Sequence, residues 1–199
     1  NFLAQVEVDT YDVSRVTMGI NPFQFDWLLT AGETFQAPEV VMVYSDAGLK
    51  GVSQTYHKLY RERLARGEWR DKERPVLINN WEATGMDFTE DKLLAFAKTA
   101  AEDGVELFVL DDGWFGGRRH ERAGLGDWVA NLELLPNGIT GLAKKINELG
   151  LMFGLWFEPE MVNEDSELFR KHPEWIIRVP DRSVSHGRHQ YVLDFGRPE

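Results

Sequence analysis

Hydrophobic and polar residues alternate along the first part of the chain. Apolar side chains occupy every second position from Phe2 to Val8, and the alternation returns at residues 23–29. A period of two residues is typical of a strand with two different faces. An apolar run follows at 40–44. Residues 1–47 are therefore predicted to be antiparallel β structure, the C-terminal part of an N-terminal β-sandwich.

The period then changes to that of a helix. Apolar residues recur at helical spacing with charged residues between them, so a helix is expected over residues 49–66, ended by Gly67. The charged stretch 69–75 ends in a proline and is typical of a domain boundary. Residues 48–75 are therefore interpreted as a linking helix and linker.

Three units, each a strand followed by a helix, are predicted in the rest of the chain. The expected strands are 76–80, 106–110 and 151–155, and the expected helices are 91–103 with Thr89 as N-cap, 139–149 and 165–171. An extended piece at 175–179 and either a strand or a loop at 191–195 follow. Apolar strands alternating with helices favour an α/β fold with a parallel sheet. A (β/α)8 barrel needs about 250 residues, so residues 76–199 are predicted to be the N-terminal part of one.

Each predicted strand ends at aromatic and acidic residues. The three ends read Trp81-Glu82, Asp111-Asp112-Gly113-Trp114 and Trp156-Phe157-Glu158-Pro159-Glu160. Because the carboxyl ends of parallel strands meet at one edge of the sheet, these side chains are expected to line one pocket. Indole rings pack on the C–H face of a pyranose, and carboxylates accept hydrogen bonds from its hydroxyls. The pattern therefore indicates a sugar site.

Each of these residues also has a structural interpretation. The aspartates can cap the turn that follows their strand, and each tryptophan can be a core residue. Glu82, Glu158 and Glu160 can each pair with an arginine across the pocket mouth, and this role is favoured for Glu82 and Glu160. The basic loop 116–126 is either a flexible, solvated loop or a lid or subunit contact.

Charge and composition exclude several classes of protein. A formal net charge of −11 leaves no basic footprint for nucleic acid, and the lack of cysteine excludes disulfides and thiolate metal sites. Only His186 and His189 are close in sequence, so no metal site is expected. Without a membrane-length apolar run or a signal-peptide pattern, a soluble, cytoplasmic protein is predicted. The chain begins without Met, and both ends look cut.

Several strings of residues resemble one known family. They are INNWEATGMDFTE, FVLDDGWFGGR with LGDW and LPNGITGL, GLWFEPEMVN with HPEWI, and GRHQYVLDFGRPE. Together they closely resemble the bacterial α-galactosidases of glycoside hydrolase family 36. The resemblance implies a truncated N-terminal β-supersandwich followed by an interrupted (β/α)8 barrel. It also implies retaining hydrolysis of terminal α-1,6-linked galactose from melibiose, raffinose and stachyose, without a cofactor and by a homotetramer.

The resemblance implies roles for individual residues. Asp111 and Asp112 match the aspartate pair that holds the 4- and 6-hydroxyls of galactose. Trp81 and Trp156 match aromatic residues that line the galactose subsite, and Arg188 matches a substrate-binding arginine. The family's nucleophile, in a later KWDMN-type strand, and its acid/base aspartate have no counterpart in this sequence. No catalytic residue is therefore assigned.

The aspartate pair suits binding better than catalysis. Retaining hydrolysis needs two carboxyl groups about 5–5.5 Å apart, whereas adjacent side chains along a strand point to opposite faces. We therefore predict that the chain carries the galactose-recognition half of an α-galactosidase site. Two alternatives stay open: a non-catalytic sugar-binding protein, and a metal-assisted α/β hydrolase that uses Asp111, Asp112 and Glu158. Raffinose-transferring and α-N-acetylgalactosaminidase relatives stay open as well.

Overall fold

The computed structural model describes residues 2–23, 25–184 and 186–197. The chain divides into two compact units, Asn1–Lys72 and Glu73–Glu199. The predicted division into residues 1–47, 48–75 and 76–199 is finer and stays a prediction.

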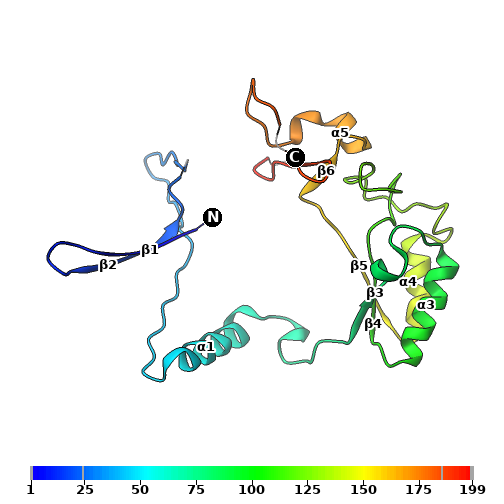
Figure 1. Cartoon of the computed structure of the whole chain (residues 1–199), viewed down its shortest axis with the longest axis horizontal. Coiled ribbons are helices and arrows are strands. Elements are labelled where there is room, and N and C mark those ends of the chain that lie inside the picture. Colours follow the sequence, from blue (N-terminus) through cyan, green and yellow to red (C-terminus); the bar gives the residue numbers. More distant parts are fainter. Residues whose placement is uncertain (1, 24, 185, 198–199) are drawn as a thin grey trace. The chain divides into compact units, whose positions relative to one another are not determined.

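The first unit begins with a β-hairpin. β1 (Phe2–Val8) pairs with β2 (Ser14–Ile20) in an antiparallel register (Figure 1). Asp9 closes the turn, because its carboxylate accepts hydrogen bonds from the backbone amides of Tyr11 and Val13 at 2.8 and 3.0 Å. The first strand predicted from the alternation is therefore confirmed.

The predicted strands at 23–29 and 40–44 are wrong, since residues 25–47 contain no strand. A strand needs a neighbouring strand for its backbone groups, and in the described part of the first unit only β1 and β2 pair. The apolar side chains of this segment are mostly exposed. Trp27, for example, is 62% exposed and packs on Phe35 with ring centroids 5.0 Å apart.

The linking helix ends earlier than its apolar spacing predicts. α1 (Gly48–Leu59) continues as a wider π turn, η1 (Tyr60–Leu64). The helix predicted over 49–66 is therefore confirmed in type and ends two residues short. Gly67 adopts a positive φ of 69° at the break, a conformation that glycine allows without strain. A short 3-10 turn, η2 (Glu68–Arg70), follows.

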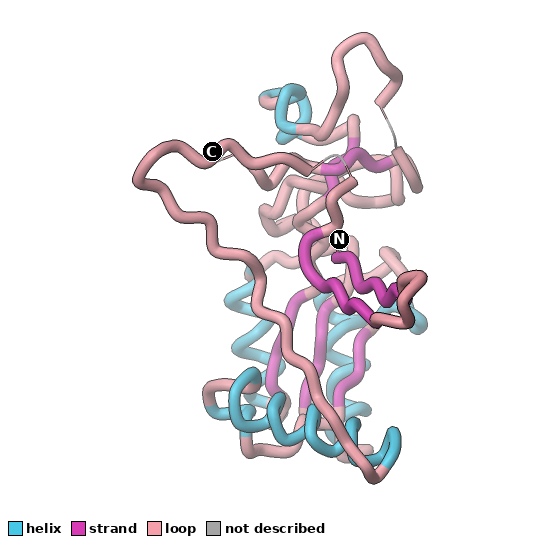
Figure 2. The backbone as a smooth tube through the Cα atoms, turned by 90° about the vertical axis from the view of Figure 1, so that its left-hand side faces the viewer, coloured by secondary structure: helices cyan, strands magenta, loops and turns pink. Residues whose placement is uncertain are grey.

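Three parallel strands form the sheet of the second unit. β3 (Leu77–Asn79), β4 (Leu107–Leu110) and β5 (Met152–Leu155) are neighbours in sequence order, with Phe108 of the central strand opposite Phe153. Figure 2 shows the three strands side by side. The predicted parallel α/β sheet is confirmed.

Two helices cover one face of this sheet. α3 (Glu90–Glu102) and α4 (Gly138–Glu148) lie together on that face (Figure 1). Thr89 caps α3 as predicted, because its hydroxyl oxygen accepts a hydrogen bond from the amide of Lys92 at 3.3 Å.

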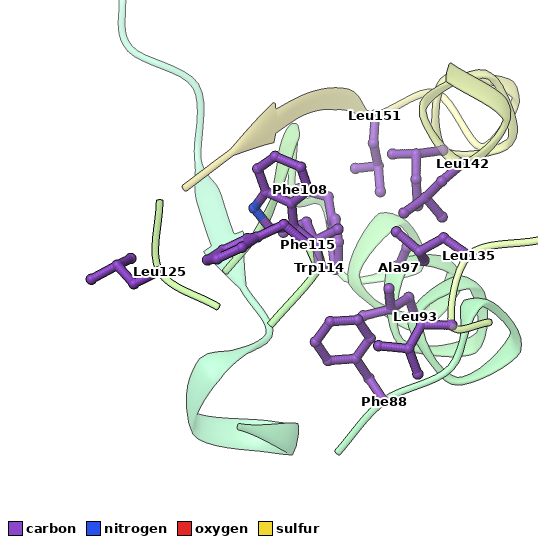
Figure 3. Close-up of a cluster of buried hydrophobic side chains, with 13 residues drawn as sticks. Phe88, Leu93, Ala97, Phe108, Trp114, Phe115, Leu125, Leu135, Leu142 and Leu151 are labelled. Carbon is purple, nitrogen blue, oxygen red and sulfur yellow. The ribbon is translucent and has the colours of Figure 1, made fainter. Parts of the chain in front are cut away.

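The apolar core lies between these helices and the sheet (Figure 3). The central buried side chains are Leu93, Ala97, Phe108, Leu110, Leu142 and Ile146. Burying a leucine or phenylalanine contributes about 1.5–3 kcal/mol. The core therefore anchors β4, and with it the polar residues that follow this strand.

A smaller antiparallel sheet follows β5. It pairs β6 (Met161–Asn163), which was not predicted, with β7 (Gln190–Val192), near the strand or loop expected at 191–195. α5 (Glu167–Lys171) confirms the last predicted helix, and η3 (Pro173–Trp175) follows it. Among the described residues, no helix has the length and apolar character needed to cross a membrane.

Candidate functional site

A pocket of about 510 Å³ lies at the carboxyl ends of the three parallel strands. Its lining residues are Asn79, Trp81, Glu82, Asp111, Asp112, Trp156, Phe157, Glu158, Glu160 and Arg188. The expected convergence of the strand ends is therefore found. The five residues predicted to bind substrate lie in this one pocket, and their roles stay predictions.

Asp111 is held in place by two asparagines at the end of β3: Asn79 is its last residue, and Asn80 follows it. Its Oδ2 accepts a hydrogen bond from Nδ2 of Asn79, and its backbone amide donates to Oδ1 of Asn80, both at 2.9 Å. Its other oxygen, Oδ1, accepts from the amide of Asp112 at 2.7 Å. The sequence analysis placed both asparagines inside the expected strand 76–80 and gave them no role, although they lie at its carboxyl end. Extending the strand-end argument to amide side chains would have found them.

Asp112 is nearly buried and pairs with Arg118, which the sequence interpretation also missed. The Nε of Arg118 lies 2.9 Å from Oδ1 of Asp112, and Nη2 lies 2.8 Å from Oδ2. Asp112 is 5% exposed and Arg118 only 1%. A bidentate guanidinium–carboxylate pair of this kind has a fixed geometry. The aspartate therefore does more than cap a turn.

The loop 116–126 is partly buried, which corrects the interpretation of its basic sequence as a solvated loop. Arg118 is buried within it, and so are Ala123 and Leu125. Gly124 has a φ of 79°, and a Cβ there would lie 2.8 Å from the backbone nitrogen of Arg118. The loop therefore packs closely around the arginine.

The three tryptophans that follow the strands have different surroundings. Trp81 begins the short helix α2 (Trp81–Thr84), lines the pocket and is 39% exposed. Trp156 also lines the pocket but packs partly against the core. Trp114 is a core residue, 3% exposed, and its Nε1 donates a hydrogen bond to the carbonyl of Trp156 at 3.1 Å. The interpretation as a core residue is therefore correct for Trp114 and holds in part for Trp156.

Arg188 reaches the pocket from the turn that precedes β7. Arg188 and His189 have positive φ values of 53° and 61°, and the flanking Gly187 and Gln190 exchange backbone hydrogen bonds. Such a turn normally favours glycine or asparagine. Non-glycine residues in this conformation are strained, and such strain is concentrated at functional sites. The turn places Arg188 in the lining of the pocket.

Glu158 forms the ion pair of the pocket mouth, rather than Glu82 or Glu160. Its Oε1 lies 3.8 Å from Nη1 of Arg188. Burial raises the pKa of the Glu158 carboxyl, and the charge of Arg188 opposes this rise without cancelling it. The pocket therefore holds a carboxyl group that is easier to protonate than usual.

Metal-ligating side chains do not gather in the part of the chain that the structure describes. No group of three or more histidine, aspartate or glutamate residues there could hold a metal ion. His186 and His189, the only close pair in the sequence, lie outside the lining of this pocket.

The sheet and its pocket define an α/β protein with a polar, aromatic site at the ends of parallel strands. The chain belongs to the Melibiase family, whose model matches residues 34–199.

Individual relatives resemble the chain over its whole length. It is 65% identical to the α-galactosidase AgaA of Geobacillus stearothermophilus over 199 residues, which is 100% of this chain and 27% of AgaA. The crystal structure of the GH36 α-galactosidase AgaB from the same organism superposes with a TM-score of 0.96 at 66% identity, over 99% of this chain and 27% of AgaB. A doubly substituted AgaA in complex with raffinose gives a TM-score of 0.95 at 65% identity, over 99% and 27% of the two chains.

The chain thus spans about a quarter of the length of these relatives. The predicted fold class is confirmed: the chain is the first part of a (β/α)8 barrel, preceded by the end of an antiparallel β-sandwich.

Proposed function

We propose that this chain is the galactose-recognition part of an α-galactosidase, which hydrolyses terminal α-D-galactosides of the melibiose and raffinose type with retention of configuration. One observation carries the proposal. Trp81 and Trp156 line the same pocket as Asp111 and Asp112, so a sugar ring can meet aromatic faces and hydroxyl acceptors together. The complex of the related AgaA with raffinose supports this substrate class.

Both aspartates bind hydroxyl groups in this proposal, and neither is the nucleophile. The carboxylate of Asp112 is already paired with Arg118, and that of Asp111 accepts hydrogen bonds from Asn79 and from a backbone amide. Carboxylates held in this way are poor nucleophiles but well-oriented acceptors. Arg188, at the pocket mouth, contributes a donor to the sugar. The nucleophile and the acid/base group lie outside this chain.

We also propose a location, an oligomeric state and a range of partners for the complete gene product. It is proposed to be a cytoplasmic homotetramer that binds neither nucleic acid nor membranes, which fits the formal net charge of −11. Light scattering of the complete product measures the tetramer directly.

Hydrolysis of an aryl α-galactoside by the complete gene product, beside the purified 199-residue chain, tests the function. An aryl α-glucoside, which differs only at C4, is the control for hydroxyl recognition. We expect the complete product to cleave the galactoside alone and to release the α-anomer first, while the folded chain is inactive. Turnover by the chain itself would place the chemistry on the carboxylates of this pocket. Galactose binding without any turnover by the complete product would instead favour a non-catalytic sugar-binding protein.

A further inference from the structure

We propose that Arg118 is a positioning residue, which fixes the carboxylate of Asp112 for one sugar hydroxyl and links it to the turn that carries Arg188. This inference rests on the proposed function of the pocket. Arg118 does not line the pocket and does not touch the sugar in this proposal. Its effect reaches the ligand through Asp112.

The carboxylate of Asp112 has more acceptor positions than Arg118 occupies. An ionised carboxylate has about four lone-pair positions on its two oxygens. Arg118 donates to Oδ1 at 2.9 Å and to Oδ2 at 2.8 Å, with a longer contact from Nε to Oδ2 at 3.2 Å. Because Asp112 also lines the pocket, its remaining acceptor positions are available to a ligand. The arginine therefore determines the direction in which the free acceptors point.

Arg118 is itself held in place by hydrogen bonds. Its Nη1 donates to Oδ1 of Asn163 at 2.9 Å and to the carbonyl of Ala123 at 3.2 Å. The side chain of Arg118 is 0% exposed, so no water competes for these donors. The close approach of Gly124 to its backbone leaves the residue little space to shift. A guanidinium held on both sides can hold a carboxylate in one rotamer.

Asn163 links Arg118 to the opposite wall of the pocket, which carries Arg188. The Nδ2 of Asn163, on β6, donates to the carbonyl of His189 at 2.9 Å. His189 is the second residue of the strained turn that presents Arg188. Arg118 and Asn163 thus connect Asp112 with the turn that carries Arg188, through the bidentate pair and two further hydrogen bonds.

Substitution of Arg118 tests this role in the complete gene product, and the adjacent Arg119 offers a matched control. Arg119 is 42% exposed and lies 4.0 Å from the exposed Glu133, so Arg119→Lys is expected to have no effect. Arg118→Lys keeps the positive charge but loses the bidentate geometry. Calorimetry would measure the dissociation constants of D-galactose and of its four monodeoxy analogues, which lack the hydroxyl at C2, C3, C4 or C6.

Arg118→Lys is expected to weaken galactose binding by about tenfold or more, since a hydrogen bond to a charged acceptor is misdirected. The loss should be much smaller for the analogue that lacks the hydroxyl bound by Asp112. Unchanged galactose affinity would overturn the proposal. An equal loss with galactose and every analogue would also overturn it, because it would indicate a general structural defect.

A second variant covers the case in which Arg118→Lys does not fold. Asn163→Ala removes one acceptor of Nη1, together with the hydrogen bonds of Asn163 to the backbone of Glu121, Leu125 and His189, and keeps both side chains of the Arg118–Asp112 pair. A smaller loss with the same hydroxyl selectivity supports the positioning role, and either an equal loss for all sugars or no loss overturns it. Wild-type protein that binds no galactose would refute the proposed function itself, whereas wild-type binding with an unaffected Arg118→Lys variant would refute this inference alone.

Discussion

Trp81 and Trp114 both follow a strand end, yet their burial predicts opposite effects of substitution. Trp81 is 39% exposed in the pocket, whereas Trp114 is 3% exposed in the core. We expect Trp81→Ala to weaken galactose binding while the free energy of unfolding changes little. Trp114→Ala should lower that free energy by about 3–5 kcal/mol, because it opens a cavity. Urea unfolding of the chain and calorimetry on the complete gene product measure the two effects. Strong destabilisation by Trp81→Ala would contradict this assignment.

Glu158 predicts a pH-dependent stability. Because burial raises its pKa above the ordinary value of 4.5, the protonated carboxyl is favoured in the folded state. Protonated Glu158 therefore contributes its full stabilisation below about pH 4.5. This stabilisation is lost as the pH rises through the pKa that Glu158 has in the folded state. The neutral variant Glu158→Gln should be more stable than the wild-type chain at pH 7 and equally stable at pH 4. The lost ion pair matters little, since Arg188 is 69% exposed.

Thermal unfolding of the wild-type chain and of the Glu158→Gln variant between pH 4 and pH 7 measures this difference in stability. A variant that is less stable than wild type at pH 7 would mean that the contact with Arg188 outweighs the cost of burial.

Among the elements, α3 and α4 are joined by one buried carboxylate. Glu90, in the first turn of α3, accepts hydrogen bonds from Asn137, which precedes α4, and from Lys145 within α4. Burial raises the pKa of Glu90, but these hydrogen bonds and the charge of Lys145 outweigh it, so the pKa is lowered. A lowered pKa means stability that is present above about pH 4.5 and is lost as the pH falls through the folded pKa.

Glu90→Gln is therefore expected to reduce the free energy of unfolding at pH 7 by about 1–3 kcal/mol, as for a hydrogen bond to a charged group. The difference from wild type should shrink as the pH falls below 4.5, the ordinary pKa of this carboxyl. Lys145→Gln should act in the same direction. The neighbouring Lys144 is 78% exposed, so Lys144→Gln is the control that should change nothing measurable. Equal effects of the two lysine substitutions would contradict the buried link.

The elements of the second unit could be predicted because their signals are local. Helices α3 and α4 have apolar residues at helical spacing, and Thr89 marks the first of them. Contacts between distant residues left no comparable signal. Arg118 is buried because distant residues such as Asp112 and Asn163 pair with it, whereas the glycine-rich, basic sequence around it is typical of a surface loop. The three-residue strands β6 and β7 are too short for a period to be recognised. The pocket could therefore be located from sequence, but the network behind it could not.

At the scale of the whole molecule, the segment 25–47 pairs with no strand, whereas the three strands of the parallel sheet pair with one another. Residues 25–47 form no strand, although their apolar residues suit one. β4, in contrast, pairs on both sides and carries the fully buried Phe108 and Leu110. Opening free energies follow buried contacts and backbone pairing. The two regions should therefore differ strongly in amide hydrogen exchange.

We expect the amides of residues 25–47 to exchange at nearly unprotected rates in the 199-residue chain, while those of β4 exchange slowest. In the complete gene product, the same segment should become protected if further strands of a β-sandwich pair with it, because pairing supplies the missing hydrogen bonds. Hydrogen exchange followed by mass spectrometry compares the two proteins peptide by peptide, with β4 as the internal reference. Protection of residues 25–47 in the chain alone would indicate that the segment orders itself. Continued rapid exchange in the complete product would mean that its alternation of apolar residues serves a purpose other than a strand.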